Sequence, residues 1–198
     1  MAFIRDIPSD EATEEVRALY DRDREMLGYV ANYTKAFAHR PEVYTAWARL
    51  IGAIRSGMDK RRYELVTLAA ASQLRSSYCM LAHGTVLLRS NLVTGDELEA
   101  IARDYRQAGL SRAEVAMMAF AEKVTLSAHA VTAEDVETLR RHGFSDTEIF
   151  DIAVTAAARC FFSKTLDAVG AVPDEIFRSL DERVRRALTV GRPFGEPA

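Results

Sequence analysis

The sequence has few cysteines, few lysines and no long uncharged run, and each shortage excludes a class of protein. Two cysteines in 198 residues are too few for the disulfide framework of a small secreted domain. Of the 26 basic side chains only four are lysine, and 29 acidic side chains balance them, which excludes a strongly basic surface for nucleic acid. The longest stretch without a charged residue is 13 residues, 76–88, too short a helix to cross a bilayer.

The first residues also lack the charged-then-apolar pattern of a signal peptide. We therefore expect a cytoplasmic protein with neither nucleic-acid nor membrane partners. The 48% hydrophobic content is that of an ordinary globular protein, and 198 residues suffice for a domain with a sizeable core. No linker, low-complexity run or clear repeat divides the chain. We expect a single all-α domain over residues 1–198, with a flexible tail over 191–198 that contains proline and glycine.

Four capping motifs indicate the all-α fold. In each one a hydroxyl residue precedes a carboxylate by three positions, so that the two side chains can bind free N–H groups at a helix start. The motifs begin at Thr94, Ser111, Thr132 and Ser145. Each opens a segment of helical apolar spacing, and no segment alternates as a strand does. About ten helices are predicted, over residues 10–27, 31–38, 42–56, 59–75, 77–90, 95–107, 112–127, 133–141, 146–170 and 173–188.

Two of these helices are apolar almost all round. Residues 63–74 carry one charge, Glu64, and residues 152–162 carry one charge, Arg159. Such helices are surrounded by other helices, so we expect them at the centre of the fold. A cation in that position needs a carboxylate, a helix C-terminus or a ligand anion. For Arg159 we favour a structural ion pair.

The residues with the clearest chemistry are Cys79 and His83, which lie one helical turn apart and therefore on one face. The Ser76–Ser77 pair favours a helix start just before Cys79. The thiol then lies in the first turn, where free N–H groups and the helix dipole favour an anion. His83 could accept the thiol proton, and Glu64 from the preceding helix could orient the imidazole.

Each of these residues also has a structural interpretation. Cys79 can be a small core side chain, and His83 can be hydrogen-bonded to backbone or water. Glu64 can pair with Arg61 or Arg62. As a metal site the three residues would be a weak zinc pattern, because a second cysteine or histidine is missing. We predict no metal and no cofactor.

Residues 58–88 resemble the carboxymuconolactone decarboxylase and alkylhydroperoxidase D superfamily. Its redox-active members carry a glutamate, then a Cys-x-x-Cys pair twelve residues on, then three residues and a histidine. Glu64, Cys79 and His83 match the glutamate, the second cysteine and the histidine, with every spacing kept. Ser76 stands at the position of the first cysteine.

The segments that begin at Phe120, Val131 and Leu139 are similar to the peroxidase-related subgroup of that family. The resemblance therefore covers about residues 40–170. It implies an alkylhydroperoxidase D-like helical bundle, and members of the family associate as dimers, trimers or hexamers. A homo-oligomer is expected.

The resemblance also implies a thiol-dependent hydroperoxide reductase. Carried over, Cys79 would attack the hydroperoxide, His83 would be its base and Glu64 would orient that base. In the family the first cysteine resolves the oxidised second one as a disulfide. Ser76 cannot do so, which leaves an external thiol or Cys160, although we expect Cys160 to be a core residue.

Other interpretations remain open. Tyr78, inside the motif, could donate a hydrogen bond to the site or only pack. The chain could instead be an acid/base decarboxylase or isomerase of a lactone or small carboxylic acid, with His83 and Glu64 as the working pair and Cys79 as a bystander. A third hypothesis is a non-catalytic helical oligomer.

Overall fold

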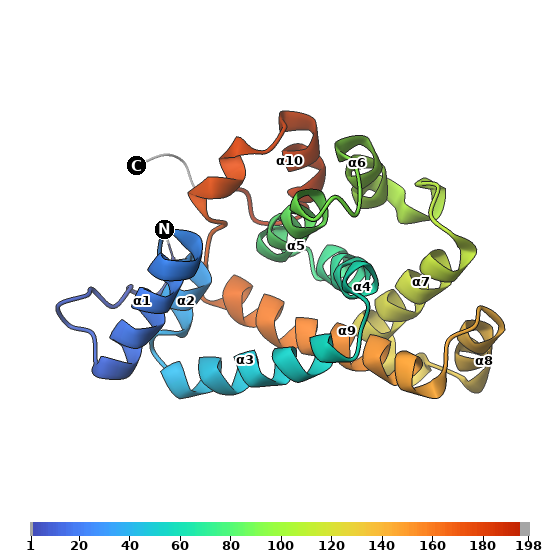
Figure 1. Ribbon diagram of the computed structural model, residues 1–198, viewed down its shortest axis with the longest axis horizontal. Coiled ribbons are helices and arrows are strands. Elements are labelled where there is room, and N and C mark those ends of the chain that lie inside the picture. The colour runs from blue at the N-terminus through green and yellow to red at the C-terminus, as the bar shows by residue number, and fades with distance from the viewer. Residues whose placement is uncertain (1, 195–198) are drawn as a thin grey trace.

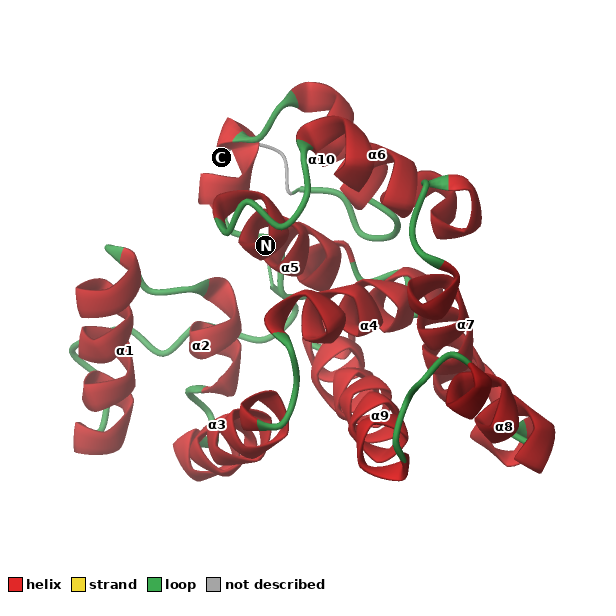
Figure 2. Cartoon of the chain, turned by 45° about the vertical axis from the view of Figure 1, so that its right-hand side comes forward, coloured by secondary structure: helices red, strands yellow, loops and turns green. Residues whose placement is uncertain are grey.

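Helices form all of the regular structure between residues 2 and 194, the part of the chain that the computed structural model describes (Figure 1 and Figure 2). The α-helices in chain order are α1 (Glu14–Leu27), α2 (Asn32–Phe37), α3 (Pro41–Ser56), α4 (Lys60–Gln73), α5 (Ser77–Arg89), α6 (Gly95–Asp104), α7 (Arg112–Ser127), α8 (Ala133–Arg141), α9 (Asp146–Ala168) and α10 (Glu182–Leu188). Three short 3-10 helices are η1 (Tyr105–Gln107), η2 (Ala128–Ala130) and η3 (Glu175–Ser179). No strand occurs within residues 2–194, so the all-α prediction is confirmed. None of the described helices is long and apolar enough to cross a membrane.

Capping side chains fix where several helices begin. All four predicted capping boxes form, at the starts of α6, α7, α8 and α9. At α9 the backbone N–H of Glu148 donates to the Ser145 hydroxyl (3.3 Å), and the backbone N–H of Ser145 donates to the Glu148 carboxylate (2.8 Å). These bonds join residues three positions apart, and for that reason the sequence alone predicts them.

The helix predicted over 173–188 is wrong as a single element. The chain divides there into η3 and α10, and Leu180 between them has extended backbone. Asp181 starts the second piece, because its carboxylate accepts the backbone N–H groups of Arg183 (2.9 Å) and Val184 (3.4 Å). Asp181, which lies inside an amphipathic pattern in the sequence, is therefore the N-cap of a new helix.

The centre of the fold is α4, which packs against α5, α7 and α9. Both ribbon views place α4 between α5 and α9, with α7 beside it (Figure 1 and Figure 2). Every residue of α4 from Tyr63 to Ala71 is buried, as the apolar pattern predicts. The one charged side chain in that buried run is Glu64. The packing of α4 thus brings a carboxylate into the core.

Two arginines at the start of α4 hold the neighbouring helices. Arg61 pairs with Glu114 (2.7 Å), and Arg62 pairs with Glu148, so each binds the glutamate of a capping box, on α7 and on α9. Both guanidinium groups therefore have carboxylate partners other than Glu64. The interpretation of Glu64 as an ion-pair partner of these arginines is wrong.

A layer formed by α1 and α2 lies at one side of the molecule (Figure 2). It has a small apolar cluster of its own, made of Ala12, Val16, Tyr20 and Ala38. Asp174, just before η3, joins this layer to the centre by accepting the backbone N–H of Asn32 (2.7 Å) and the hydroxyl of Tyr78 (2.5 Å). Burial raises the pKa of Asp174 above its usual range, and the hydrogen bond from Tyr78 opposes that shift.

The C-terminal segment folds back on the start of α5. The backbone N–H of Gly191 donates to the Ser77 hydroxyl (2.9 Å), and a Cβ at position 191 would collide with the Arg75 carbonyl oxygen. The close approach explains why a glycine fits there. The rest of the tail predicted over 191–198, residues 195–198, lies outside the described residues.

We predict that Ser145→Ala lowers the free energy of unfolding by about 1 kcal/mol, because the first turn of α9 loses its side-chain cap. Urea denaturation followed by circular dichroism measures this change. Ser145→Gly is the matched control and should cost only a few tenths of a kcal/mol, since glycine also serves as an N-cap. Equal losses in both variants would contradict the capping account.

Candidate active site

Four polar side chains meet where α4, α5 and α9 pack together. They are Glu64 from α4, Cys79 and His83 from α5, and Arg159 from α9. Glu64 and Cys79 are each 1% exposed, Arg159 is 3% exposed, and the His83 side chain is 18% exposed. Buried charges need partners, and the contacts among these four residues supply them.

The start of α5 sets the position of Cys79. Ser76 is the N-cap of α5, so Cys79 lies in the first turn of the helix, as the sequence predicts. His83 follows one turn later on the same face. The positive end of the helix dipole therefore lies close to the sulfur.

Glu64 and His83 form a short hydrogen bond, with 2.5 Å between the Glu64 Oε2 and His83 Nδ1 atoms. The bond joins α4 to α5 and gives the buried carboxylate a partner. On the other side of the ring, His83 Nε2 lies 3.0 Å from Arg159 Nη1. A guanidinium can only donate, so Nε2 accepts and the imidazole proton is on Nδ1, pointing at Glu64.

This arrangement keeps His83 neutral. Burial lowers the pKa of His83 below its usual value; the carboxylate of Glu64 raises it in part, and the positive charge of Arg159 lowers it again. A neutral imidazole between a carboxylate and a guanidinium separates the two charges by one ring. His83 is therefore a base whose lone pair faces Arg159.

Arg159 makes no ion pair with a carboxylate in the described part of the chain, so the structural ion pair that we favoured is wrong. Its guanidinium carbon lies 5.5 Å from the ring centres of both Trp47 and Phe162, and its Nη2 donates to the Tyr63 hydroxyl (3.3 Å). Within residues 2–194 its Nε has no hydrogen-bond partner. The hydrogen-bond partner of Arg159 is the imidazole of His83, whereas a carboxylate was expected from the sequence.

The Cys79 sulfur faces two donors from α9. The Ser163 hydroxyl donates to Cys79 Sγ at 3.1 Å, and Arg159 Nη1 lies 4.0 Å from the same sulfur. In the described structure no hydrogen bond joins Cys79 directly to His83; Arg159 contacts both. Sequence reasoning missed Ser163 and this use of Arg159. The available signal was their four-residue spacing, which places two polar groups on one face of an apolar helix.

The remaining sequence candidates lie around this group. The Ser76 side chain is buried, and its hydroxyl has no partner among the described residues. The Tyr78 hydroxyl donates to Asp174 and accepts the backbone N–H of Tyr33 (3.1 Å), so it serves the α1–α2 layer while its ring lines the cavity. Cys160 is half-buried rather than a core residue, and it does not line the cavity.

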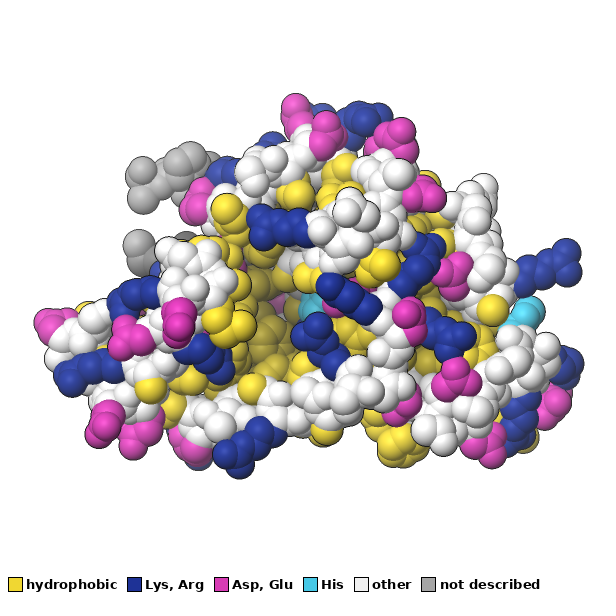
Figure 3. All heavy atoms as spheres, viewed as in Figure 1, with side chains coloured by type: hydrophobic (Ala, Val, Ile, Leu, Met, Phe, Trp, Pro, Cys, Tyr) yellow, Lys and Arg dark blue, Asp and Glu magenta, His cyan; other side chains and the backbone are white. Residues whose placement is uncertain are grey.

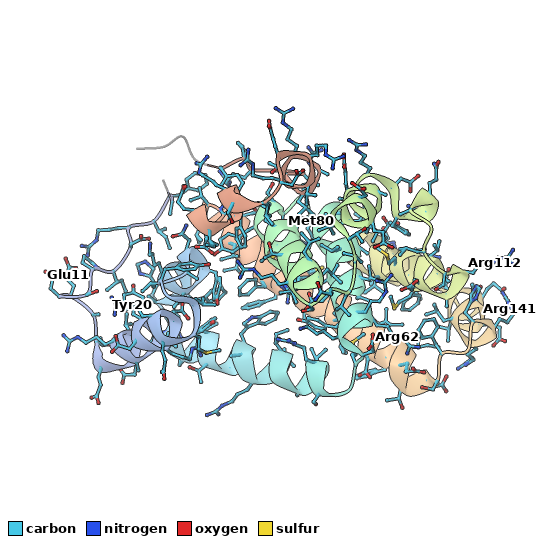
Figure 4. The ribbon with its side chains drawn as sticks, turned by 45° about the horizontal axis from the view of Figure 1, so that its top comes forward. Glu11, Tyr20, Arg62, Met80, Arg112 and Arg141 are labelled. Atoms are coloured by element: carbon cyan, nitrogen blue, oxygen red, sulfur yellow. The ribbon has the colours of Figure 1, made fainter. Side chains whose placement is uncertain are left out.

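A cavity of 430 Å³ opens beside Cys79. The space-filling view shows a hollow with a hydrophobic floor between the α1–α2 layer and the centre of the molecule, with a histidine visible beside it (Figure 3). Side chains project from α3 toward the helices that face it (Figure 4). The aromatic residues of its wall are Tyr33, Tyr44, Trp47, Tyr63, Tyr78 and Phe162. The volume suits a small organic molecule.

Residues 41–123 match the family model of the carboxymuconolactone decarboxylase family. The match lies inside the predicted range of 40–170. No protein of curated function matches the chain in sequence. Within residues 2–194 no group of three or more His, Cys, Asp or Glu side chains is placed to hold a metal ion.

Solved structures show the same fold. The chain is similar to an uncharacterized peroxidase-related protein from Ralstonia eutropha JMP134, described as an alkylhydroperoxidase AhpD core, with 27% identity over 89% of this chain and 94% of that one and a TM-score of 0.80. A peroxidase-related protein from Silicibacter sp. TM1040 has 28% identity over 88% and 93% of the two chains and a TM-score of 0.78. The debrominase Bmp8, solved as a cysteine-to-alanine variant with 2,3,4-tribromopyrrole, shares the fold at 17% identity over 92% and 94%, with a TM-score of 0.69. The predicted alkylhydroperoxidase D-like fold is confirmed.

We predict that wild-type protein loses stability relative to His83→Gln as the pH falls below 6.5, the ordinary pKa of histidine. In the unfolded chain the imidazole then binds a proton, whereas in the folded chain its lowered pKa means that it binds fewer protons at the same pH. The unfolded state therefore gains protons, and the difference between the two proteins changes by up to about 1.4 kcal/mol per pH unit.

Urea denaturation of both proteins from pH 7.5 to pH 5 measures this difference. Other titrating groups are common to both proteins, so they largely cancel. A difference that does not vary with pH would show that folding leaves the pKa of His83 unchanged.

Proposed function

We propose that this protein is a thiol-dependent hydroperoxide reductase in which Cys79 is the nucleophile. The observation that carries the proposal is the setting of the Cys79 sulfur, which faces the Ser163 hydroxyl and the Arg159 guanidinium at the wall of a largely aromatic cavity. Both donors favour the negatively charged thiolate. The likeness to peroxidase-related proteins supports the same chemistry.

The first step removes the proton of the Cys79 thiol. His83 is the base, because it is neutral and its Nε2 carries the lone pair. Arg159 Nη1 lies 3.0 Å from that nitrogen and 4.0 Å from the sulfur, so a small rotation moves the guanidinium from one to the other. Nε2 then accepts the thiol proton, Glu64 stabilises the imidazolium, and Arg159 stabilises the thiolate.

The second step is a two-electron transfer. The thiolate attacks one oxygen of the hydroperoxide, the S–O bond forms, and the O–O bond breaks. The leaving alkoxide takes the bonding electron pair and receives a proton from His83 Nε2, so that it departs as an alcohol. Cys79 is oxidised to a sulfenic acid while the hydroperoxide is reduced.

An external thiol completes the cycle. It condenses with the sulfenic acid of Cys79, releasing water and forming a mixed disulfide, and a second thiol displaces the first as a disulfide. Ser76, beside Cys79 at the start of α5, has no sulfur to offer. Cys160 lies outside the cavity lining. The reductant is therefore a thiol that enters from solution.

We also propose that the chain forms a homo-oligomer. Several large hydrophobic side chains on α3, α7 and α9 are exposed: Leu50, Leu126, Phe150 and Phe161. Burying such side chains between copies of the chain would remove apolar surface from water. Whether the assembly is a dimer, a trimer or a hexamer stays a prediction of the family resemblance.

The direct test of the activity is hydroperoxide consumption in the presence of a thiol reductant. We expect Cys79→Ser to reduce the rate to that of the reductant alone, because a serine hydroxyl is a far weaker nucleophile than a thiolate. Cys160→Ser is the matched control, and it should keep the wild-type rate. Full activity in Cys79→Ser would overturn the mechanism and leave acid/base chemistry by His83 and Glu64 as the alternative.

A further inference from the structure

The cavity beside Cys79 carries an excess of positive charge. Three arginines line it, Arg22 from α1, Arg55 from α3 and Arg159 from α9, against one carboxylate, Asp23. That carboxylate is already used, since Asp23 accepts the backbone N–H of Ala31 (3.1 Å) and lies 3.6 Å from Arg22. The other two arginines therefore face the cavity without a counter-ion on its wall.

Arg55 and Arg159 lie at the same end of the cavity. The guanidinium of Arg55 lies over the ring of Tyr63, 5.4 Å from its centre, and Arg159 Nη2 donates to the hydroxyl of the same tyrosine. Burial is the largest cause of the lowered pKa of His83, and the positive charges of Arg159 and Arg55 lower that pKa further. In the described part of the chain neither arginine has a carboxylate partner.

Arg159 is buried, and its charge is balanced only indirectly, by Glu64 through the ring of His83. A guanidinium that is 3% exposed has lost its hydration, and its Nε has no partner among the described residues. The ring of His83 separates the guanidinium from the carboxylate of Glu64, so the two groups make no direct contact. A planar guanidinium matches the geometry of a carboxylate, because two parallel N–H groups can donate to its two oxygens. An anion that enters the cavity would give these arginines a direct counter-ion.

The rest of the wall is aromatic. Rings of Tyr33, Tyr44, Trp47 and Phe162 surround a volume of 430 Å³. Flat apolar walls of this kind favour a flat apolar ligand, because ring faces stack and exclude water. The cavity thus combines aromatic walls with two unpaired cations at one end.

We propose that the cavity binds a small aromatic carboxylate, with the carboxylate at Arg55, inside the field of Arg159, and the ring against the aromatic wall. This inference deepens the proposed function, because it names the substrate class as an aromatic hydroperoxide that also bears a carboxylate. That assignment of a substrate rests on the proposed hydroperoxide reductase activity. The binding itself needs no turnover. Arg55 is then a specificity residue, separate from the residues that activate Cys79.

The binding test uses Trp47, which is the one tryptophan of the chain and lines the cavity. Benzoate and its neutral isostere benzamide are titrated against the protein without peroxide or thiol, and tryptophan fluorescence is followed. We expect benzoate to bind at least about tenfold more tightly than benzamide, as one charge-assisted contact implies. Equal binding of the two compounds, or no saturable change with either, would overturn the proposal.

Two variants of α3 identify the cation. Arg55→Gln should weaken benzoate binding about tenfold and leave benzamide binding unchanged. Arg49→Gln is the matched control: it removes the same charge from the same helix, at an exposed position that does not line this cavity, and should bind benzoate as the wild type does. If Arg55→Gln binds benzoate as tightly as the wild type, Arg55 does not hold the carboxylate and the proposal fails.

A second arm separates this inference from the proposed function. Cumene hydroperoxide and its para-carboxylate derivative are compared as substrates, and kcat/KM should favour the carboxylate in the wild type and lose that preference in Arg55→Gln. Selective benzoate binding with no consumption of either hydroperoxide would refute the reductase and leave the binding assignment standing. Consumption of both at equal rates would confirm the reductase and refute the carboxylate preference.

Discussion

The hydrogen bond between Arg159 and His83 is the contact on which the site depends. It joins α9 to α5 in the core, and the same guanidinium reaches α4 through the Tyr63 hydroxyl and α3 through the ring of Trp47. Four helices thus meet at one buried cation. An isolated charge there would be strongly unfavourable, so its contacts explain both its position and the order of its neighbours.

The hydrogen bond between Arg159 and His83 also sets the order in which charged and neutral groups follow one another in the site. Glu64, His83 and Arg159 lie in line as an anion, a neutral ring and a cation, and the Nδ1 tautomer of His83 lets each end make a hydrogen bond. The pair of opposite charges is nearly neutral as a whole, which reduces the energetic penalty of burial. At the end of the line lies the sulfur of Cys79, beside the one member that can stabilise a thiolate. Under the proposed function, the same arrangement that balances the buried charges also places a donor beside the sulfur of Cys79.

Local sequence predicted much of this fold. The capping boxes join residues three positions apart, and the apolar run of α4 needs no knowledge of its neighbours, so both were visible in the sequence. Cys79 and His83 share a helix and lie one turn apart, and Glu64 was predicted to reach the imidazole because it is the one charge in the preceding apolar helix; the family resemblance then matched all three residues. The start of α10 was missed because Asp181, which is its N-cap, lies in an amphipathic pattern where an aspartate is also an ordinary surface residue.

The rest of the site depends on packing between distant segments. Ser163 reaches Cys79 across 84 positions of sequence, and the Tyr78 hydroxyl reaches Asp174 across 96. No periodicity encodes such contacts. The ion pair expected for Arg159 was wrong for the same reason, because only the packing of α5 and α9 on α4 shows that Arg159 meets an imidazole and not a carboxylate. The cavity and its charge excess are likewise properties of the assembled helices.

The most direct test of this account is the tautomer of His83, read from its imidazole nitrogen-15 resonances at pH 7. His83→Gln identifies those resonances among the four histidines of the chain. The account predicts a neutral ring with the proton on Nδ1, because Arg159 occupies Nε2. A ring protonated on Nε2 alone, or on both nitrogens, would contradict it, since Nε2 could then not accept a hydrogen bond from Arg159.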